Sequence, residues 1–171
     1  FVKIIANAKE EFQIKNAKYI AMDGDVLARD DAIEFVKVVA ATQKEHQADS
    51  AFKSAIDEDL LTMKENAIEF VKTVSSAEED YQSESAYLVA PNESILERED
   101  ALEFVKTIAN SKGTCQAYNA KKVALCEEVL KRPDALELVK VVAYAQENYQ
   151  SNSAGIAATN SLIIGRENAL D

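Results

Sequence analysis

The chain has 171 residues, of which 47% are hydrophobic and 29% are charged, so it is long enough to bury a core and has the composition of a folded domain. Thirty acidic residues against nineteen basic ones give a net charge of −11, which argues against nucleic acid and anionic lipid surfaces as partners. No stretch is apolar enough over a sufficient length to span a bilayer, so the composition predicts a soluble protein without a membrane partner.

Cysteine and histidine are scarce. Cys115, Cys126 and the single His46 do not form a close ligand set, so we expect no metal and no cofactor. Two free thiols in a helical chain are typical small buried groups, and they favour an intracellular, reducing compartment. Export of the protein as an effector stays open.

The string Phe-Val-Lys starts a repeat with spacings of 34, 35, 34 and 34 residues. A repeat of this length predicts five tandem units that form a single array over residues 1–171. The one-residue excess falls near Thr62-Met63, where we expect a loop. The units are residues 1–34, 35–69, 70–103, 104–137 and 138–171, and they begin at Phe1, Phe35, Phe70, Phe104 and Leu138.

Each unit is expected to contain a long first helix. An Asp or Asn stands three residues before a Glu, as in Asp31 and Glu34, which is the pattern of a capping box. Apolar residues at helical spacing follow, and Ile33 and Val38 widen their stripe until the helix is nearly surrounded. The predicted caps are Asp31, Asn66, Asp100 and Asp134, and the stripe after the first of them is Ala32, Phe35, Val36, Val39 and Ala40.

A short second helix is predicted to begin about fifteen positions after the first residue of each unit. Alanine follows the expected cap at once and again four residues later, which gives the helix one small face for close packing. The predicted second caps are Asn16, Ser50, Ser85, Asn119 and Ser153.

A third break precedes an apolar pair such as Leu60-Leu61. Pro91 stands just before one of these breaks and would interrupt a continuous helix, so we favour a third short turn of helix over a simple two-helix hairpin. The predicted third caps are Asp23, Asp57, Asn92 and Asn160.

No linker separates the units, and no unit can cover its apolar faces alone, so neighbouring units are expected to stack into a curved rod. The fold class predicted is all-α, a right-handed-type α-solenoid with one long and one or two short helices in each unit. The unit length and register resemble the α-solenoid helical-repeat proteins, among which 34 residues is the tetratricopeptide length. The tetratricopeptide Gly and Tyr positions hold other residues here, and DNA-reading repeats of similar length carry a glycine-bearing loop that this chain lacks. The resemblance therefore implies an architecture and no particular ligand.

Three repeated polar positions are interpreted as structural. Lysines such as Lys37 follow a Glu by three residues, which predicts local ion pairs. Glutamines at Gln13, Gln47, Gln82, Gln116 and Gln150 are expected to satisfy the last helix carbonyls or the next inter-helix loop. His46 shares its position with Phe12, Tyr81, Cys115 and Tyr149, which favours a semi-buried packing site over a catalytic one.

The copies differ most on the second helix, where one position holds Lys18, Phe52, Tyr87, Lys121 and Gly155 and the next holds Tyr19, Lys53, Leu88, Lys122 and Ile156. Large aromatic side chains with few rotamers suit partner anchors, and Tyr144 adds another exposed-looking ring. The candidate partner-binding residues are Tyr19, Phe52, Lys53, Tyr87, Leu88, Tyr118, Lys121 and Lys122.

These observations favour a non-enzymatic scaffold that binds a protein or peptide. No nucleophile stands beside His46 and no glycine-rich phosphate loop occurs, so we expect no catalytic residues. One alternative is a spacer or self-assembling segment of a larger protein, and another is sequence-tolerant nucleic-acid binding.

Both ends cut the period within a first helix, so the array is expected to continue beyond one or both of them. Apolar residues at these ends predict exposed faces and head-to-tail contact between molecules, which the net charge opposes at low salt. These residues are Phe1, Val2, Ile4 and Ile5 at one end and Leu162, Ile163, Ile164 and Leu170 at the other.

Overall fold

The computed structural model describes residues 1–63 and 66–170, and this part of the chain is entirely helical in its regular structure. About 70% of it lies in helices, and no strand occurs within these ranges. The all-α prediction is therefore confirmed.

The helices follow one another in a fixed order of first, second and third helix. The first helices are α1 (Val2–Asn7), α4 (Ala32–Ala41), α7 (Ala67–Ser75), α10 (Ala101–Ala109) and α13 (Ala135–Ala143). The second helices are α2 (Glu11–Ile20), α5 (Glu45–Ala55), α8 (Asp80–Val89), α11 (Thr114–Ala124) and α14 (Asn148–Ala158). The third helices are α3 (Gly24–Leu27), α6 (Glu58–Thr62), α9 (Glu93–Leu96), α12 (Glu127–Leu130) and α15 (Ser161–Ile164).

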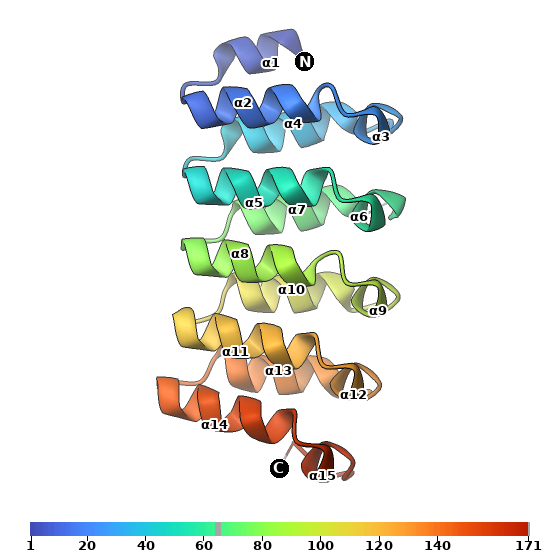
Figure 1. The fold of residues 1–171 in the computed structure, drawn as a ribbon, viewed down its shortest axis with the longest axis vertical. Coiled ribbons are helices and arrows are strands. Elements are labelled where there is room, and N and C mark those ends of the chain that lie inside the picture. The colour runs from blue at the N-terminus through green and yellow to red at the C-terminus, as the bar shows by residue number, and fades with distance from the viewer. Residues whose placement is uncertain (64–65, 171) are drawn as a thin grey trace.

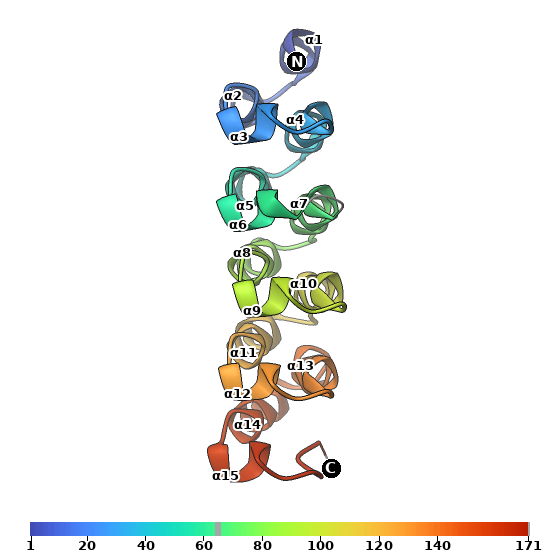
Figure 2. The same cartoon turned by 90° about the vertical axis from the view of Figure 1, so that its right-hand side faces the viewer.

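The helices stack into an elongated molecule with two layers. Second helices form one layer, first helices form the other, and third helices line one edge (Figure 1). The view turned by 90° separates the two layers and places the chain ends at opposite ends of the stack (Figure 2). Each second helix packs against first and second helices that are close in chain order, as α5 does against α2, α7 and α8. The core therefore runs along the stack between the layers.

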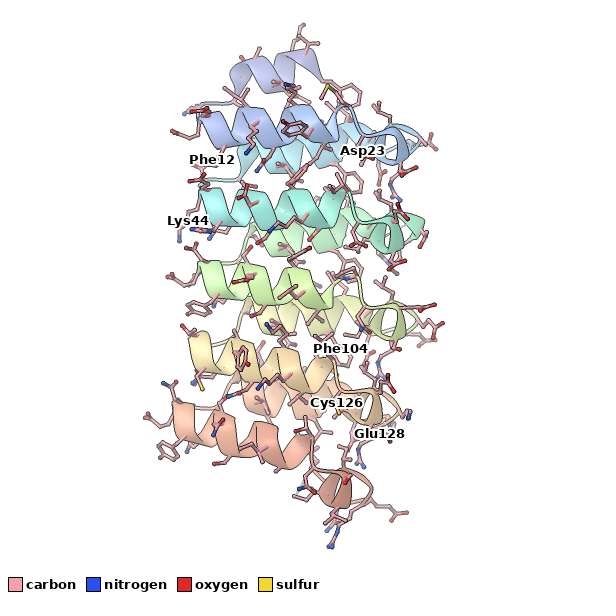
Figure 3. All side chains as sticks on the ribbon, viewed as in Figure 1. Phe12, Asp23, Lys44, Phe104, Cys126 and Glu128 are labelled. Carbon is pink, nitrogen blue, oxygen red and sulfur yellow. The ribbon has the colours of Figure 1, made fainter. Side chains whose placement is uncertain are left out.

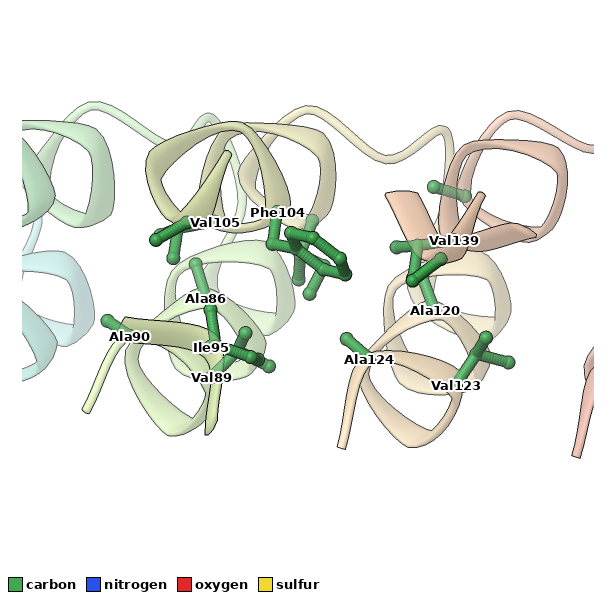
Figure 4. Close-up of a cluster of buried hydrophobic side chains, with 14 of the residues drawn as sticks. Ala86, Val89, Ala90, Ile95, Phe104, Val105, Ala120, Val123, Ala124 and Val139 are labelled. Carbon is green, nitrogen blue, oxygen red and sulfur yellow. The ribbon is translucent and has the colours of Figure 1, made fainter. Parts of the chain in front are cut away.

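The apolar stripe predicted for the first helix is buried. Phe35, Phe70 and Phe104 are fully buried at equivalent positions, and the whole stripe from Ala32 to Ala40 is buried in α4. Figure 4 shows Phe104 and Val105 pointing from α10 toward the layer of second helices. Ile33 remains 42% exposed, so the prediction of a nearly surrounded helix is wrong.

Alanines form the small face expected of the second helices. Ala86, Ala90, Ala120 and Ala124 are all fully buried, and they lie in the cluster of Figure 4. Small side chains here let the second helices pack closely against the first helices.

The predicted start of the second helix is wrong. Asn16 and Ser50 lie in the middle of α2 and α5, and the same holds for Ser85, Asn119 and Ser153 in their helices. The second helix begins earlier and is longer than the first helix of its unit. At its start, a reciprocal capping box joins Glu10 to Gln13, Glu79 to Gln82 and Glu147 to Gln150.

Four of the five polar residues mistaken for caps, all except the exposed Ser153, are buried at junctions between second helices. Asn16 Nδ2 donates to Asp49 Oδ1 at 2.8 Å, and Asn119 Nδ2 donates to Ser151 Oγ at 3.2 Å. Locally they resemble caps, since Asn and Ser are common at both kinds of position.

The first-helix starts are placed correctly, but the capping box is not formed. Asp31, Asn66, Asp100 and Asp134 stand at the N-cap positions, yet none makes a side-chain cap hydrogen bond. The carboxylate of Asp31 is held instead by Arg29, whose Nε and Nη2 donate at 2.8 and 3.0 Å. The competing arginine explains the error.

The third-helix caps are confirmed. Asp23, Asp57, Asn92 and Asn160 each accept hydrogen bonds from backbone N–H groups of the turn that follows. Pro91 lies between the end of α8 and the start of α9, as expected. The extra residue of the second unit falls in the region of Thr62 and Met63, where α6 ends one residue later than its equivalents, and the rest of that connection lies outside the described residues.

Candidate binding surface

The eight predicted partner-binding residues all come from the outer layer of second helices. We call them the second-helix row: Tyr19 on α2, Phe52 and Lys53 on α5, Tyr87 and Leu88 on α8, and Tyr118, Lys121 and Lys122 on α11. The helices α2, α5, α8 and α11 that carry these residues lie one after another along the stack (Figure 3). They are far apart in sequence and neighbours along the stack.

Two contacts in the row cross from one second helix to the next. The rings of Tyr19 and Phe52 lie 6.2 Å apart between centroids, at an interplanar angle of 48°. One period further, Lys53 Nζ lies 5.6 Å from the centroid of Tyr87. In each contact, the second of the two variable positions on one helix meets the first of the two on the next helix. The row is therefore continuous across these junctions.

A third group in the row lies within α11. Lys121 Nζ and Lys122 Nζ lie 5.1 and 4.5 Å from the Tyr118 ring centroid. Ammonium groups at such distances are attracted to the negative face of the ring. Leu88 makes no ring contact of this kind among the described residues.

The row is accessible. Tyr19, Leu88 and Tyr118 are 47%, 41% and 49% exposed. Phe52 and Tyr87 are half-buried, so their rings are held in place while one side remains open to solvent. Beside Lys53 and Tyr87 lies an open concavity of about 430 Å³ that Asp57, Glu58 and Asp59 also line.

The lysines of the row differ from those of the first helices. In the described part of the chain, no carboxylate lies within ion-pair distance of Lys53, Lys121 or Lys122. On the first helices, by contrast, the predicted ion pairs form between Lys37 and Glu34, Lys72 and Glu69, Lys106 and Glu103, and Lys140 and Glu137 at 2.6–2.8 Å. These pairs raise the pKa of Lys72 and Lys140 above its ordinary value, chiefly through the hydrogen bond to Glu69 or Glu137.

Four of the five repeated glutamines, Gln13, Gln47, Gln82 and Gln116, join one second helix to the connection one period later. Gln13 Nε2 donates to the Thr42 carbonyl at 2.7 Å, and Gln82 Nε2 donates to the Ser111 carbonyl at 2.7 Å. Both acceptors lie in the connection between the next first and second helices, so the predicted role at the next inter-helix loop is confirmed. In Figure 3 this edge is the one that carries Lys44.

An arginine contact on the opposite edge was not predicted from the sequence. Arg98 holds Asp100 through Nε and Nη2, and its Nη1 donates to the carbonyl of Leu130 on α12 at 2.8 Å. Equivalent contacts join Arg29 to Asp31 and Leu61, and Arg132 to Asp134 and Ile164. The hydrogen bond from each arginine lowers the pKa of its aspartate.

A sequence signal for this contact existed, because Arg-x-Asp recurs in phase at residues 29–31, 98–100 and 132–134. The second unit carries Lys64 and Asn66 in the same places. The Asp of this pattern was predicted to be a helix cap because Asp is common at N-caps, whereas its carboxylate pairs with the Arg two residues earlier.

Two other predicted positions have mixed outcomes. His46 is exposed, with 75% of its side chain accessible, so the semi-buried prediction is wrong for it and for the exposed Tyr149. Asp80 Oδ2, at the start of α8, lies 3.8 Å from His46 Nε2. Phe12, Tyr81 and Cys115 are partly buried as expected.

Cys115 and Cys126 are both free thiols, and Tyr144 is 41% exposed as predicted.

Two general features of the surface bear on function. Within residues 1–63 and 66–170, no group of three or more His, Cys, Asp or Glu side chains is arranged to hold a metal ion. In the same part of the chain, every helix is too short or too polar to cross a membrane.

The apolar ends of the stack are largely exposed. Val2 is 81% and Leu162 is 78% exposed, and Phe1, Ile163 and Leu170 are 36–40% exposed. Ile164 is only 5% exposed, which corrects the prediction for that residue. It is covered because α15 packs against α12 and α14.

Comparison with protein-family models, with curated proteins and with solved structures finds no match for this chain. The function must therefore be argued from the geometry of the surface itself.

Proposed function

We propose that the chain is a non-enzymatic scaffold that binds a protein or peptide along the second-helix row. Its frame is a right-handed-type α-solenoid of five tandem units in one array, with the resemblance to helical-repeat proteins confined to architecture. The ligand lies across successive second helices and contacts rings and lysines from several of them.

One observation carries this proposal: aromatic and lysine side chains from different second helices contact each other and form one accessible row. Rings that are already held on one side lose little side-chain freedom when a ligand covers the other. The buried stripes of phenylalanine and valine, with the glutamine and arginine contacts at the junctions, keep the spacing of the row fixed.

A displayed library of random peptides, selected on the wild-type chain, tests the proposal. Selected peptides are then measured on the variant Phe52→Ala/Tyr87→Ala/Tyr118→Ala and on the control Tyr144→Ala/Tyr149→Ala, which removes rings outside the row. We expect the first variant to weaken binding at least tenfold and the control to leave it within about twofold. Circular dichroism confirms that each variant is folded. No enriched peptide, or equal loss in both variants, would contradict the proposal.

The second candidate is a spacer or self-assembling segment, and the exposed Val2 and Leu162 side chains favour it. Apolar surfaces at opposite ends of one stack can meet head to tail in a heterologous contact. Sedimentation velocity over a range of protein concentration and salt tests this candidate. Association that grows with both would support it, and a monomer under all conditions would contradict it.

A further inference from the structure

Charge is distributed unevenly along this acidic protein. Residues 104–137 contain six basic and four acidic side chains, whereas the preceding period, residues 70–103, contains two basic and nine acidic ones. A net positive segment therefore adjoins the most acidic one. The net charge of residues 104–137 therefore differs in sign from that of the whole protein.

The positive charge of this segment includes two cations held at one ring. Lys121 and Lys122 lie in the last turn of α11, where the partial negative charge of the helix end favours them, and both approach Tyr118. Two other lysines of the segment are neutralised locally, Lys106 by Glu103 and Lys131 by Glu128. Lys121 and Lys122 have no such carboxylate among the described residues.

The side of this group that faces α8 carries an exposed leucine and, among the described residues, no cation to attract a carboxylate. Lys53 lies over Tyr87 across the α5–α8 junction, and one period further the same two positions are held by Leu88 and Lys121. Leu88 is 41% exposed, and the exposed Glu84 lies one turn before it on α8. A partner carboxylate is therefore repelled on the α8 side and attracted on the α11 side.

We propose that Tyr118, Lys121 and Lys122 bind an acidic segment of a partner protein, with its carboxylates at the two lysines and an adjoining apolar residue beside Leu88. This inference rests on the proposed function and names the chemistry of the ligand. Carboxylates replace the missing counter-ions of the two lysines, and the exposed face of Tyr118 supplies contact area.

A nucleic acid fits this group less well than a short acidic segment does. Its backbone carries a phosphate at every nucleotide, so a strand running along the row would cross the acidic surface of residues 70–103. A peptide can place its few carboxylates over α11 alone.

Fluorescence anisotropy with short labelled peptides tests the inference. The acidic probe carries Leu and Phe followed by a run of Glu, and matched probes replace Glu by Gln or by Lys. A labelled single-stranded oligonucleotide is the fourth probe. The variant is Lys121→Gln/Lys122→Gln, and the control is Lys106→Gln/Lys140→Gln, which changes the net charge equally but lies on the first helices.

We expect the wild-type chain to bind the Glu probe most tightly, with an affinity that falls as salt is raised. The lysine variant should lose about tenfold in affinity, and the control should stay within about twofold. Equal binding of the Gln probe, equal loss in both variants, or tighter binding of the oligonucleotide would overturn the inference. If the displayed library yielded only neutral peptides that bind the second-helix row, the proposed function would still hold, but the preference for acidic ligands would be wrong. A chain to which no peptide binds would contradict both.

Discussion

At the scale of single residues, the glutamine of the second helix satisfies backbone groups of two units. Gln82 Oε1 accepts the N–H of Glu79 at 2.8 Å, and its Nε2 reaches the Ser111 carbonyl. Gln116 satisfies fewer backbone groups, because its Oε1 is buried without a partner among the described residues and its Nε2 lies 3.2 Å from the Ala145 carbonyl. The N-cap residue of α11 is Gly113, whereas helices that form a capping box, such as α8, have Glu at this position.

The first prediction concerns this amide. Gln82→Ala should lower the free energy of unfolding by about 1–3 kcal/mol, since it leaves a buried carbonyl and an N–H without partners. Gln116→Ala should cost less, because one end of that amide is already unsatisfied. Urea unfolding measures both, with the exposed Gln146→Ala expected within about 0.5 kcal/mol of wild type. Equal losses at all three positions would show that the contact between units contributes nothing.

The second prediction follows from the arginine-bound aspartates. The pKa values of Asp31, Asp100 and Asp134 are lowered in the folded protein, mainly by hydrogen bonds from Arg29, Arg98 and Arg132. Their carboxylates therefore stabilise the fold above the unfolded pKa of about 3.9, and this stabilisation is lost as pH falls below it. Thermal unfolding between neutral pH and about pH 3 should show a falling midpoint.

The triple variant Asp31→Asn/Asp100→Asn/Asp134→Asn provides the control for that pH dependence. It should be less stable at neutral pH and lose less on acidification, since its three amides do not titrate. If the unfolding midpoint of the variant fell as steeply below pH 4 as that of the wild type, the pH dependence would not come from these three carboxylates.

The third prediction concerns Gly155 in the middle of α14. A Cβ added there would lie 3.4 Å from Asn119 Cβ, which is an ordinary van der Waals contact. Gly155→Ala should therefore raise the free energy of unfolding by about 0.5–1 kcal/mol, because glycine weakens a helix interior. Gly24→Ala, at the first position of α3 with nothing near its Cβ, is the comparison. Destabilisation at Gly155 would mean that the contact with Asn119 cannot accommodate a methyl group.

At the scale of elements, the sequence was sufficient to predict the class of fold and most of the buried positions. Recurrence of residues such as Phe35 and Phe70 fixes which positions face the core, because a repeat places equivalent residues in equivalent surroundings. Most starts of first and third helices were also found, since Asp or Asn stands there whatever its partners are, but α12 begins after Cys126 and was missed.

The second helix was misplaced because its start is capped by Glu and Gln, while Asn16 and its equivalents inside the helix look like caps. Local chemistry cannot tell a cap from a buried polar contact with a residue one period away. For the same reason the sequence suggested which residues form the second-helix row but not which of them touch, such as Lys53 and Tyr87.

The fourth prediction tests the arginine contact between third helices. Arg98 donates to both carboxylate oxygens of Asp100 and also to the Leu130 carbonyl, and lysine cannot reproduce this planar fork. Arg98→Lys should lower the free energy of unfolding by about 1–2 kcal/mol. Arg166→Lys is the matched control, because Arg166 is exposed and its side chain, among the described residues, donates to the Leu162 carbonyl within its own turn. Guanidinium chloride unfolding measures both variants. Equal losses of unfolding free energy for Arg98→Lys and Arg166→Lys would contradict the proposed role of the planar Arg98 guanidinium.

At the scale of the whole molecule, the core is divided. Buried apolar side chains form one contact cluster from Ala17 to Val71 and a second from Leu60 to Ile164. The two clusters meet at α6 and α7, since Phe70 and Val74 belong to the second cluster and Ala67 and Val71 to the first. Although α5 packs firmly against α7 and α8, the third helices α6 and α9 make weaker contact there than α3 with α6 or α9 with α12. The Arg-x-Asp pattern is also interrupted there by Lys64 and Asn66.

The last prediction follows from this division. In a stack whose units contact only their neighbours, stability is close to a sum of terms for each unit and each junction, so the weakest junction separates the cooperative blocks. Native-state hydrogen exchange in low denaturant should therefore show α2, α4 and α5 opening together, at a lower free energy than α8, α10 and α11. Lys64→Arg/Asn66→Asp restores the pattern of the other units and should bring the two opening energies closer together. Lys72→Arg, which leaves the junction pattern unchanged, should not. Uniform exchange energies across both blocks in the wild type would show that the second junction is as strong as the others and that the molecule unfolds as one unit.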